Sequence, residues 1–197
     1  MELQFVVDII IAMHMFCFAA CIGISLFAES MIVPRFLNQI DRRDVEFLSE
    51  AHRLVHISLM GLWLSGVALL WLTLGVMGEP LTAQLIMKFV IVAVLSFNIK
   101  MIADHALPVF RHNIGNHLGV LTRYELRFLG ILAGVSTSGW MLALGLGAID
   151  MFQTLAGWQL AAIFVPLMIA APLIGAHMTP KIVNEARRGP RLALCRL

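Results

Sequence analysis

The sequence predicts an all-α polytopic membrane protein, with five transmembrane helices in one antiparallel bundle that forms a single domain. The chain of 197 residues is 60% hydrophobic, and only 13% of its residues are charged. Its mean hydropathy is +0.89, well above that of a typical soluble domain. Apolar runs long enough to cross about 30 Å of hydrocarbon recur five times. The bilayer is therefore the expected environment of the chain.

The apolar runs and the breaks between them define the predicted spans. These are about residues 5–27, 54–76, 84–108, 127–149 and 158–177. The first run is too long, and too acidic at its start, for a signal peptide, and it continues as a polar-faced helix to about Phe36. We expect a solvated connector at 38–50 and a tight turn at 78–80.

The second half of the chain has less regular boundaries. The third helix is predicted to bend or end near Pro108, because proline cannot continue the backbone hydrogen bonds of a helix. The fourth helix is predicted to begin at about Leu118, ahead of its membrane span. A basic tail follows residue 177.

The distribution of positive charge predicts the orientation of the chain. All but one of the 14 Lys and Arg residues lie around the first connector, around the third connector or in the tail. With five spans, these three regions fall on one side, and the positive-inside rule assigns that side to the cytoplasm. The N-terminus is then outside, the C-terminus is cytoplasmic, and the expected location is the bacterial cytoplasmic (inner) membrane.

The remaining cation, Lys88, lies in the outer half of the third span, and His14 lies in the outer half of the first. At 1.5 Å per residue, both lie about 10–14 Å below the outer ends of their helices, so they can face each other at one depth. A neutral imidazole and a neutral amine both ligate haem iron or another metal. His14 and Lys88 are therefore predicted to be cofactor or metal ligands.

Each of these residues also has a simpler interpretation. Lys88 can carry its amine to the outer headgroups, and His14 can be a core histidine bonded to a backbone carbonyl. Cys17 and Cys21 share a helix face with His14, which suits either a soft-metal site or a close helix contact. Cys195 is predicted to be cytoplasmic, so no structural disulfide is expected.

The third span carries polar residues that a membrane helix normally turns into its bundle. These are Lys88, Asn98, Lys100, Asp104 and His105. Lys100 and Asp104 are four residues apart and can neutralise each other. His56 with His105 or His177 has a spacing suited to a second haem or a metal, and a network of hydrogen-bonded histidines is the alternative. The same cytoplasmic layer contains His52, Glu29 and Glu125.

The order of these features resembles a known family. His14 lies in MHMF, Lys88 in LIMKFVIVAVL, Arg53 in SEAHRLVHISL and Glu125 in TRYELRF. The pattern is similar to the small haem-b membrane proteins related to the bacterial membrane-bound protoporphyrinogen IX oxidase and to copper-resistance D-like proteins. The resemblance implies that His14 and Lys88 ligate haem b. It also implies that Arg53 and Glu125 are second-layer or propionate partners.

The expected function is therefore that of a haem-b-binding protein in electron transfer or membrane redox chemistry, such as a haem-dependent oxidoreductase. The first alternative is a metal-ion or proton transporter that uses Lys100, Asp104 and the cytoplasmic histidines. The second is a non-catalytic subunit or assembly factor of a larger membrane complex. A redox partner, a larger complex or a second copy of the chain are the candidate partners, and no basic patch indicates nucleic acid.

Overall fold

The computed structural model describes residues 2–194, apart from the side chains of residues 2, 3, 33, 34, 36, 150, 153 and 187–194. The described chain is helical and contains no β-strand. Five of its helices are long and apolar enough to cross a membrane, which confirms the predicted class of protein. The prediction for Cys195 lies outside the described residues.

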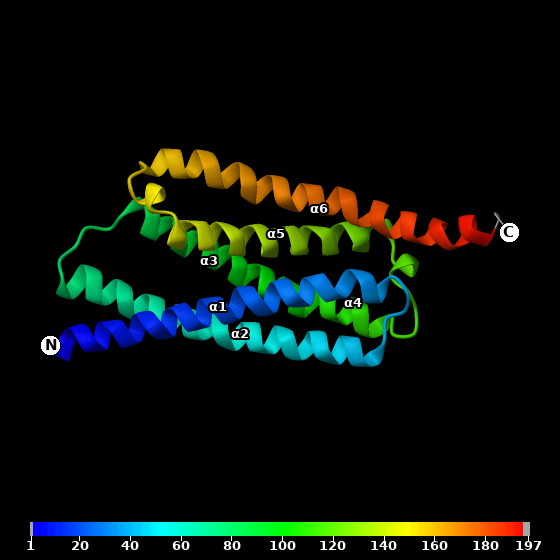
Figure 1. Ribbon diagram of the computed structural model, residues 1–197, viewed down its shortest axis with the longest axis horizontal. Coiled ribbons are helices and arrows are strands. Elements are labelled where there is room, and N and C mark those ends of the chain that lie inside the picture. Colours follow the sequence, from blue (N-terminus) through cyan, green and yellow to red (C-terminus); the bar gives the residue numbers. More distant parts are fainter. Residues whose placement is uncertain (1, 195–197) are drawn as a thin grey trace.

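Five long helices follow one another along the chain. The elements in order are α1 (Glu2–Phe36), α2 (Arg42–Trp71), η1 (Leu72–Val76), α3 (Ala83–Met101), η2 (Ile102–Ala106), α4 (Leu107–His112), η3 (Leu118–Val120), α5 (Arg123–Ala148), η4 (Asp150–Gln153) and α6 (Gly157–Leu194). The long helices lie along one axis, and successive ones run in opposite directions (Figure 1). We call the end where α1 begins the amino-terminal end, and the end where α6 finishes the carboxy-terminal end.

The first connector is shorter than the sequence suggests. Because α2 begins at Arg42, the prediction of a solvated connector over 38–50 is wrong, and only residues 37–41 lack helical structure. Val45 and Leu48 are buried, whereas the charged residues between and around them are mostly exposed. One apolar face is enough to keep this charged segment helical against the rest of the bundle.

The third helix continues past Pro108, near which we expected it to bend or end. Its backbone widens into the π-helical segment η2 and then resumes as α4, with Pro108 in the first turn. Pro108 cannot donate a backbone hydrogen bond. The wider π-helical turn before it lets the helix continue to His112 without that bond.

Two other boundaries differ from the prediction. Helix α5 begins at Arg123 instead of Leu118, because Thr122 and Glu125 form a capping box that starts the helix there. Helix α6 continues through the basic segment after residue 177 to Leu194, beyond the predicted end of the fifth span.

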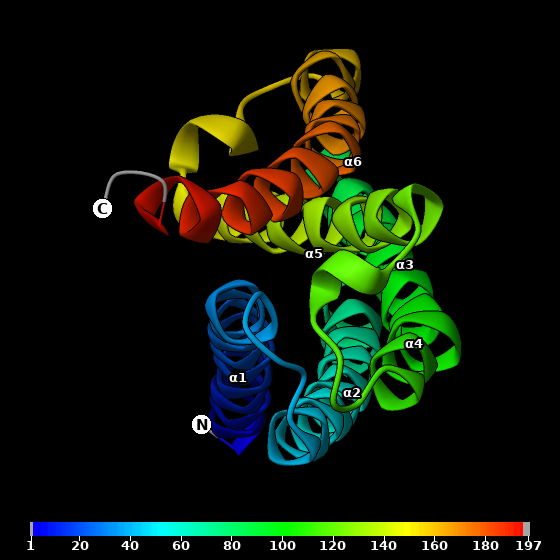
Figure 2. The same ribbon diagram turned by 90° about the vertical axis from the view of Figure 1, so that its right-hand side faces the viewer.

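Helices α5 and α6 approach each other closely along their backbones. A Cβ atom on Gly130 would lie 2.2 Å from the carbonyl oxygen of Gly175, and one on Gly134 would lie 2.5 Å from that of Ala171. Glycine therefore permits this approach, as is common between membrane helices. Figure 2 shows α1–α2 and α5–α6 as two pairs, with α3 beside α5 and α4 beside α2.

Candidate functional site

His14 and Lys88 line one cavity in the amino-terminal half of the bundle, and we call it the amino-terminal cavity. Its volume is about 220 Å³, and its walls come from α1, α2, η1 and α3. Most of the lining is apolar or aromatic, including Trp63 and Phe89, whose ring centroids are 5.8 Å apart. The cavity thus brings two nitrogen donors from distant parts of the chain to one apolar space.

The hydrogen bonds around His14 favour one tautomer of its ring. The Ser65 hydroxyl donates to the carbonyl oxygen of Gly61 at 2.7 Å, which uses its one proton. With its proton on Gly61, the Ser65 oxygen, 2.9 Å from His14 Nδ1, can accept a hydrogen bond from that nitrogen. In this tautomer Nε2 keeps its lone pair. This tautomer is the form in which histidine ligates metals.

Small residues on α2 make room for the side chains of α1. A Cβ atom on Gly66 would lie 3.3 Å from His14 Cε1, and one on Gly61 would lie 2.7 Å from Cys17 Sγ. Cys17 and Cys21 are free thiols, and the buried Cys21 thiol donates to the carbonyl oxygen of Val55 at 3.7 Å. Both cysteines thus lie at the contact between α1 and α2.

Lys88 projects from α3 toward the same cavity and is half-buried. No described residue forms a hydrogen bond or an ion pair with its amine. Charged groups inside a membrane bundle normally have a partner of opposite charge. A neutral amine needs none, and its lone pair is a potential metal ligand.

Two nitrogen donors suit haem iron better than a bare metal ion. Within the part of the chain that the structure describes, no group of three or more His, Cys, Asp or Glu residues is placed to hold a metal. Zinc sites normally take three or four protein ligands, whereas haem iron receives four nitrogens from the porphyrin and needs one or two from the protein. The donor set therefore fits haem. The volume is below the ~300–1,000 Å³ of typical ligand pockets, so a porphyrin requires the walls to separate.

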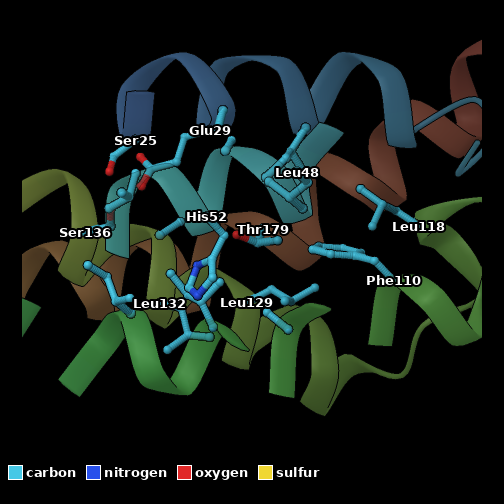
Figure 3. A pocket seen from close by; sticks show the side chains of 18 of the residues that line it. Ser25, Glu29, Leu48, His52, Phe110, Leu118, Leu129, Leu132, Ser136 and Thr179 are labelled. Atoms are coloured by element: carbon cyan, nitrogen blue, oxygen red, sulfur yellow. The ribbon is translucent and has the colours of Figure 1, made fainter. Parts of the chain in front are cut away.

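A second space, the carboxy-terminal cavity, lies toward the other end of the bundle and has a volume of about 170 Å³. Glu29 of α1 and His52 of α2 both project into it (Figure 3). The Thr137 hydroxyl of α5 donates to Glu29 Oε2 at 2.6 Å. Carboxyl and hydroxyl groups therefore mark this cavity, in place of the paired nitrogen donors at the other end.

Arg53 and Glu125 lie away from the amino-terminal cavity. Arg53 forms an ion pair with Glu50 at 2.7 Å, and it lies 13 residues before Gly66, which is about 20 Å along α2. The Glu125 carboxylate accepts hydrogen bonds from the backbone N–H and the hydroxyl of Thr122, at 2.7 and 2.8 Å. Both residues therefore have their partners outside the amino-terminal cavity.

Three of the predicted cytoplasmic histidines lie outside both cavities. His56, His105 and His177 are exposed, and none of them lines either cavity. The His105 ring packs against Phe128 of α5, with ring centroids 5.7 Å apart. The structure therefore shows no pocket for a second haem between these described rings.

The polar residues of α3 and η2 divide between the interior and the surface. Asn98 is buried and donates to the carbonyl oxygen of Leu132 at 3.1 Å. Lys100 and Asp104 pair at 2.8 Å, but both are exposed, so the expectation that they turn into the bundle is wrong for them. Because the pair neutralises its own charge, it does not need a buried partner.

The sequence did not identify Ser65 and Gly66, although both position His14. Their signal is the run GLWLSG, which places small residues within an otherwise bulky apolar span. Such residues mark close helix contacts, but they do not indicate which side chain occupies the space.

Comparisons of the chain with models of protein families, with curated proteins and with solved structures found no match.

Proposed function

We propose that this protein is an integral membrane protein that binds haem b and acts in electron transfer or membrane redox chemistry. The observation that carries the proposal is the amino-terminal cavity, where His14 and Lys88 face one apolar space from different helices. The hydrogen bond to Ser65 leaves Nε2 of His14 available to coordinate iron. Bound haem supplies a reversible one-electron change at its iron.

Four residues in or beside the cavity have separate roles in this proposal. His14 and Lys88 would hold the haem iron, and Lys88 must lose its proton to do so. Ser65 fixes the tautomer and orientation of the His14 ring. Gly66 leaves the space that the ring occupies, since a Cβ atom there would approach it to 3.3 Å. The resemblance to small haem-b membrane proteins supports the same pair of ligands.

The proposed topology is an antiparallel five-span bundle with the N-terminus outside and the C-terminus in the cytoplasm. It rests on the grouping of nearly all cations on one side and on the five long helices. A topology reporter fused after Leu197 should be cytoplasmic, and one inserted at Glu79 should be external. Two reporters on the same side would contradict the five-span arrangement.

Haem content tests the proposal. We expect the protein purified in detergent to show a haem absorbance that changes on reduction with dithionite. His14→Ala and Lys88→Ala should each lose most of this absorbance and keep their helical circular dichroism. Met15→Ala and Val90→Ala are matched controls, because these neighbours are exposed and line neither cavity. Absence of haem from the wild type, or equal haem content in all four variants, would reject the proposal.

The alternative of a metal-ion or proton transporter has less support. It depended on Lys100, Asp104 and the cytoplasmic histidines as a relay inside the bundle. Lys100 and Asp104 instead pair on the exposed surface, and His56, His105 and His177 are also exposed. A colourless purified protein that carries ions into liposomes would favour this alternative.

A further inference from the structure

We infer that the carboxy-terminal cavity is a binding site for a lipid-soluble single-ring hydroquinone or quinone. The cavity is separate from the one that holds His14 and Lys88, and the inference does not depend on haem. Its walls come from all five long helices. The cavity is therefore formed by the bundle as a whole and is not a groove between two helices.

The size and walls of the cavity suit one six-membered ring. An apolar cavity of about 150 Å³ in another protein binds benzene, and this one has a volume of about 170 Å³. Buried apolar side chains form most of its surface, including Val55, Ile99 and Leu126. Such walls disfavour a charged ligand, because it would lose its hydration without compensation.

The polar groups of the cavity are few and unevenly placed. Figure 3 shows Ser25, Glu29 and Ser136 at one end and Phe110 and Leu118 at the other, with His52 between them. The Glu29 carboxyl accepts hydrogen bonds from Thr137 and Ser136, which hold it at its end of the cavity.

Three other polar groups that line the cavity lack a hydrogen-bond partner among the described residues. These are the Ser25 hydroxyl, the His52 ring and the Thr179 hydroxyl. All three side chains are half-buried and lie beside apolar walls, so a ligand in the cavity can form hydrogen bonds with them. A purely hydrocarbon ligand would leave all three unpaired.

A hydroquinone meets both requirements. Its ring fills the apolar volume, and its hydroxyl groups at opposite edges can reach polar groups at two separate places. The Glu29 carboxyl accepts a hydrogen bond from one hydroxyl, and the imidazole of His52 accepts from or donates to the other oxygen. The oxidised quinone has only acceptors, so it uses the ring N–H of His52 but cannot donate to Glu29.

The cavity is accessible to a ligand dissolved in the bilayer. Ala133 of α5 lines the cavity and is exposed, so the cavity is open at this residue. A ring can therefore enter beside α5 from the lipid. This access is the reason for assigning a lipid-soluble ligand instead of a water-soluble one.

Calorimetric titration of the purified full-length protein tests the inference, with tetramethyl-1,4-hydroquinone and its oxidised form as probes. We expect saturable one-to-one binding of the hydroquinone. Ala51→Leu and Ala28→Leu place extra carbon atoms in the cavity and should each weaken binding at least tenfold. Ala93→Leu adds the same atoms on the exposed face of α3 and should leave binding unchanged.

Glu29→Gln tests the chemistry of the ligand without changing the shape of the site. It should weaken hydroquinone binding about tenfold and leave quinone binding equal or stronger, because an amide can donate to a carbonyl. His14→Ala should bind the hydroquinone normally, which separates this site from the proposed haem site. Absence of saturable binding, or equal binding by Ala51→Leu, Ala28→Leu and Ala93→Leu, would overturn the inference. Loss of co-purified phospholipid in Ala51→Leu without ring binding would assign the cavity to an acyl chain and also overturn it.

Discussion

The two cavities occupy one apolar bundle but present different chemistry. In the amino-terminal cavity, the imidazole of His14 and the amine of Lys88 accompany one hydroxyl, that of Thr73, and Ser65 lies beside His14. In the carboxy-terminal cavity, a carboxyl, three hydroxyls and an imidazole face apolar walls. The volumes of about 220 and 170 Å³ are similar, so size does not distinguish them. The polar groups distinguish the two cavities. They are the basis for proposing a metal-centred cofactor at one end and a hydrogen-bonding ring at the other.

The cavities also depend on different helix contacts. The amino-terminal cavity is formed by α1, α2 with η1, and α3, and it relies on Gly66 to admit His14. The carboxy-terminal cavity includes residues of α5 and α6, among them Thr179. Disruption of the contact between α5 and α6 should therefore affect the carboxy-terminal cavity first.

The largest effect is expected from Gly130→Ala. Its new Cβ atom would lie 2.2 Å from the carbonyl oxygen of Gly175 and 2.6 Å from Thr179 Oγ1, so the two helices must separate. Overpacking against a backbone should lower the free energy of unfolding by about 3 kcal/mol, the upper end of the usual range. Thermal unfolding in detergent measures this loss of stability. Hydroquinone binding should weaken as well.

Gly147→Ala is the matched control on the same helix, because nothing lies within 4 Å of the new atom. It should leave stability equal or raise it by about 0.5–1 kcal/mol, the difference in helix propensity between Gly and Ala. If both variants unfold at the wild-type temperature, the close approach of α5 and α6 is contradicted.

A smaller effect is expected from Ser65→Ala at the other end of the bundle. Removal of the hydroxyl frees His14 Nδ1 and allows the ring to change tautomer and rotate. Loss of such an orienting hydrogen bond typically lowers metal affinity by about 10-fold or more. Titration of the apoprotein with haem measures the change, and Ser58→Ala, on the same helix but lining neither cavity, is the control. Equal haem affinity in both variants would show that Ser65 does not position His14.

The smallest effect concerns the exposed pair outside both cavities. Lys100→Met leaves Asp104 without its partner at 2.8 Å, whereas Lys100→Met with Asp104→Leu removes both charges. We expect the single variant to give less folded protein than the double variant, because an unpaired carboxylate facing lipid is unfavourable. Equal yields of the two variants would place the pair in water or among headgroups.

The sequence was sufficient to predict the helices but not which of their faces turn inward. Five apolar runs gave five long helices, since each run is long enough to cross hydrocarbon. Lys88 and Lys100 lie on one such helix, about 120° apart around its axis at 3.6 residues per turn. Lys88 turns toward a cavity and Lys100 turns outward. Because lipid and bundle interior are both apolar, the hydrophobic pattern does not distinguish the two faces.

The cavities themselves were beyond what the sequence could predict. His14 and Lys88 stood out as polar residues in apolar spans, and their depths matched by counting along the helices. The space between them depends on where α1 crosses α2, and therefore on Gly66. Ser25 and Thr179 gave no signal, because isolated hydroxyl residues are common in membrane helices and usually bond to their own backbone.

The absorption spectrum of Lys88→Arg, recorded beside that of the wild type before and after reduction with dithionite, tests the central claim most directly. Arginine keeps the positive charge and the length of the side chain, but its guanidinium offers no lone pair to iron. If Lys88 ligates haem, the variant should lose most of the haem absorbance or show an altered spectrum, with helical content unchanged. A lysine that only carries its charge to the headgroups is replaced well by arginine. Normal haem loading with an unchanged spectrum in Lys88→Arg would therefore contradict the account.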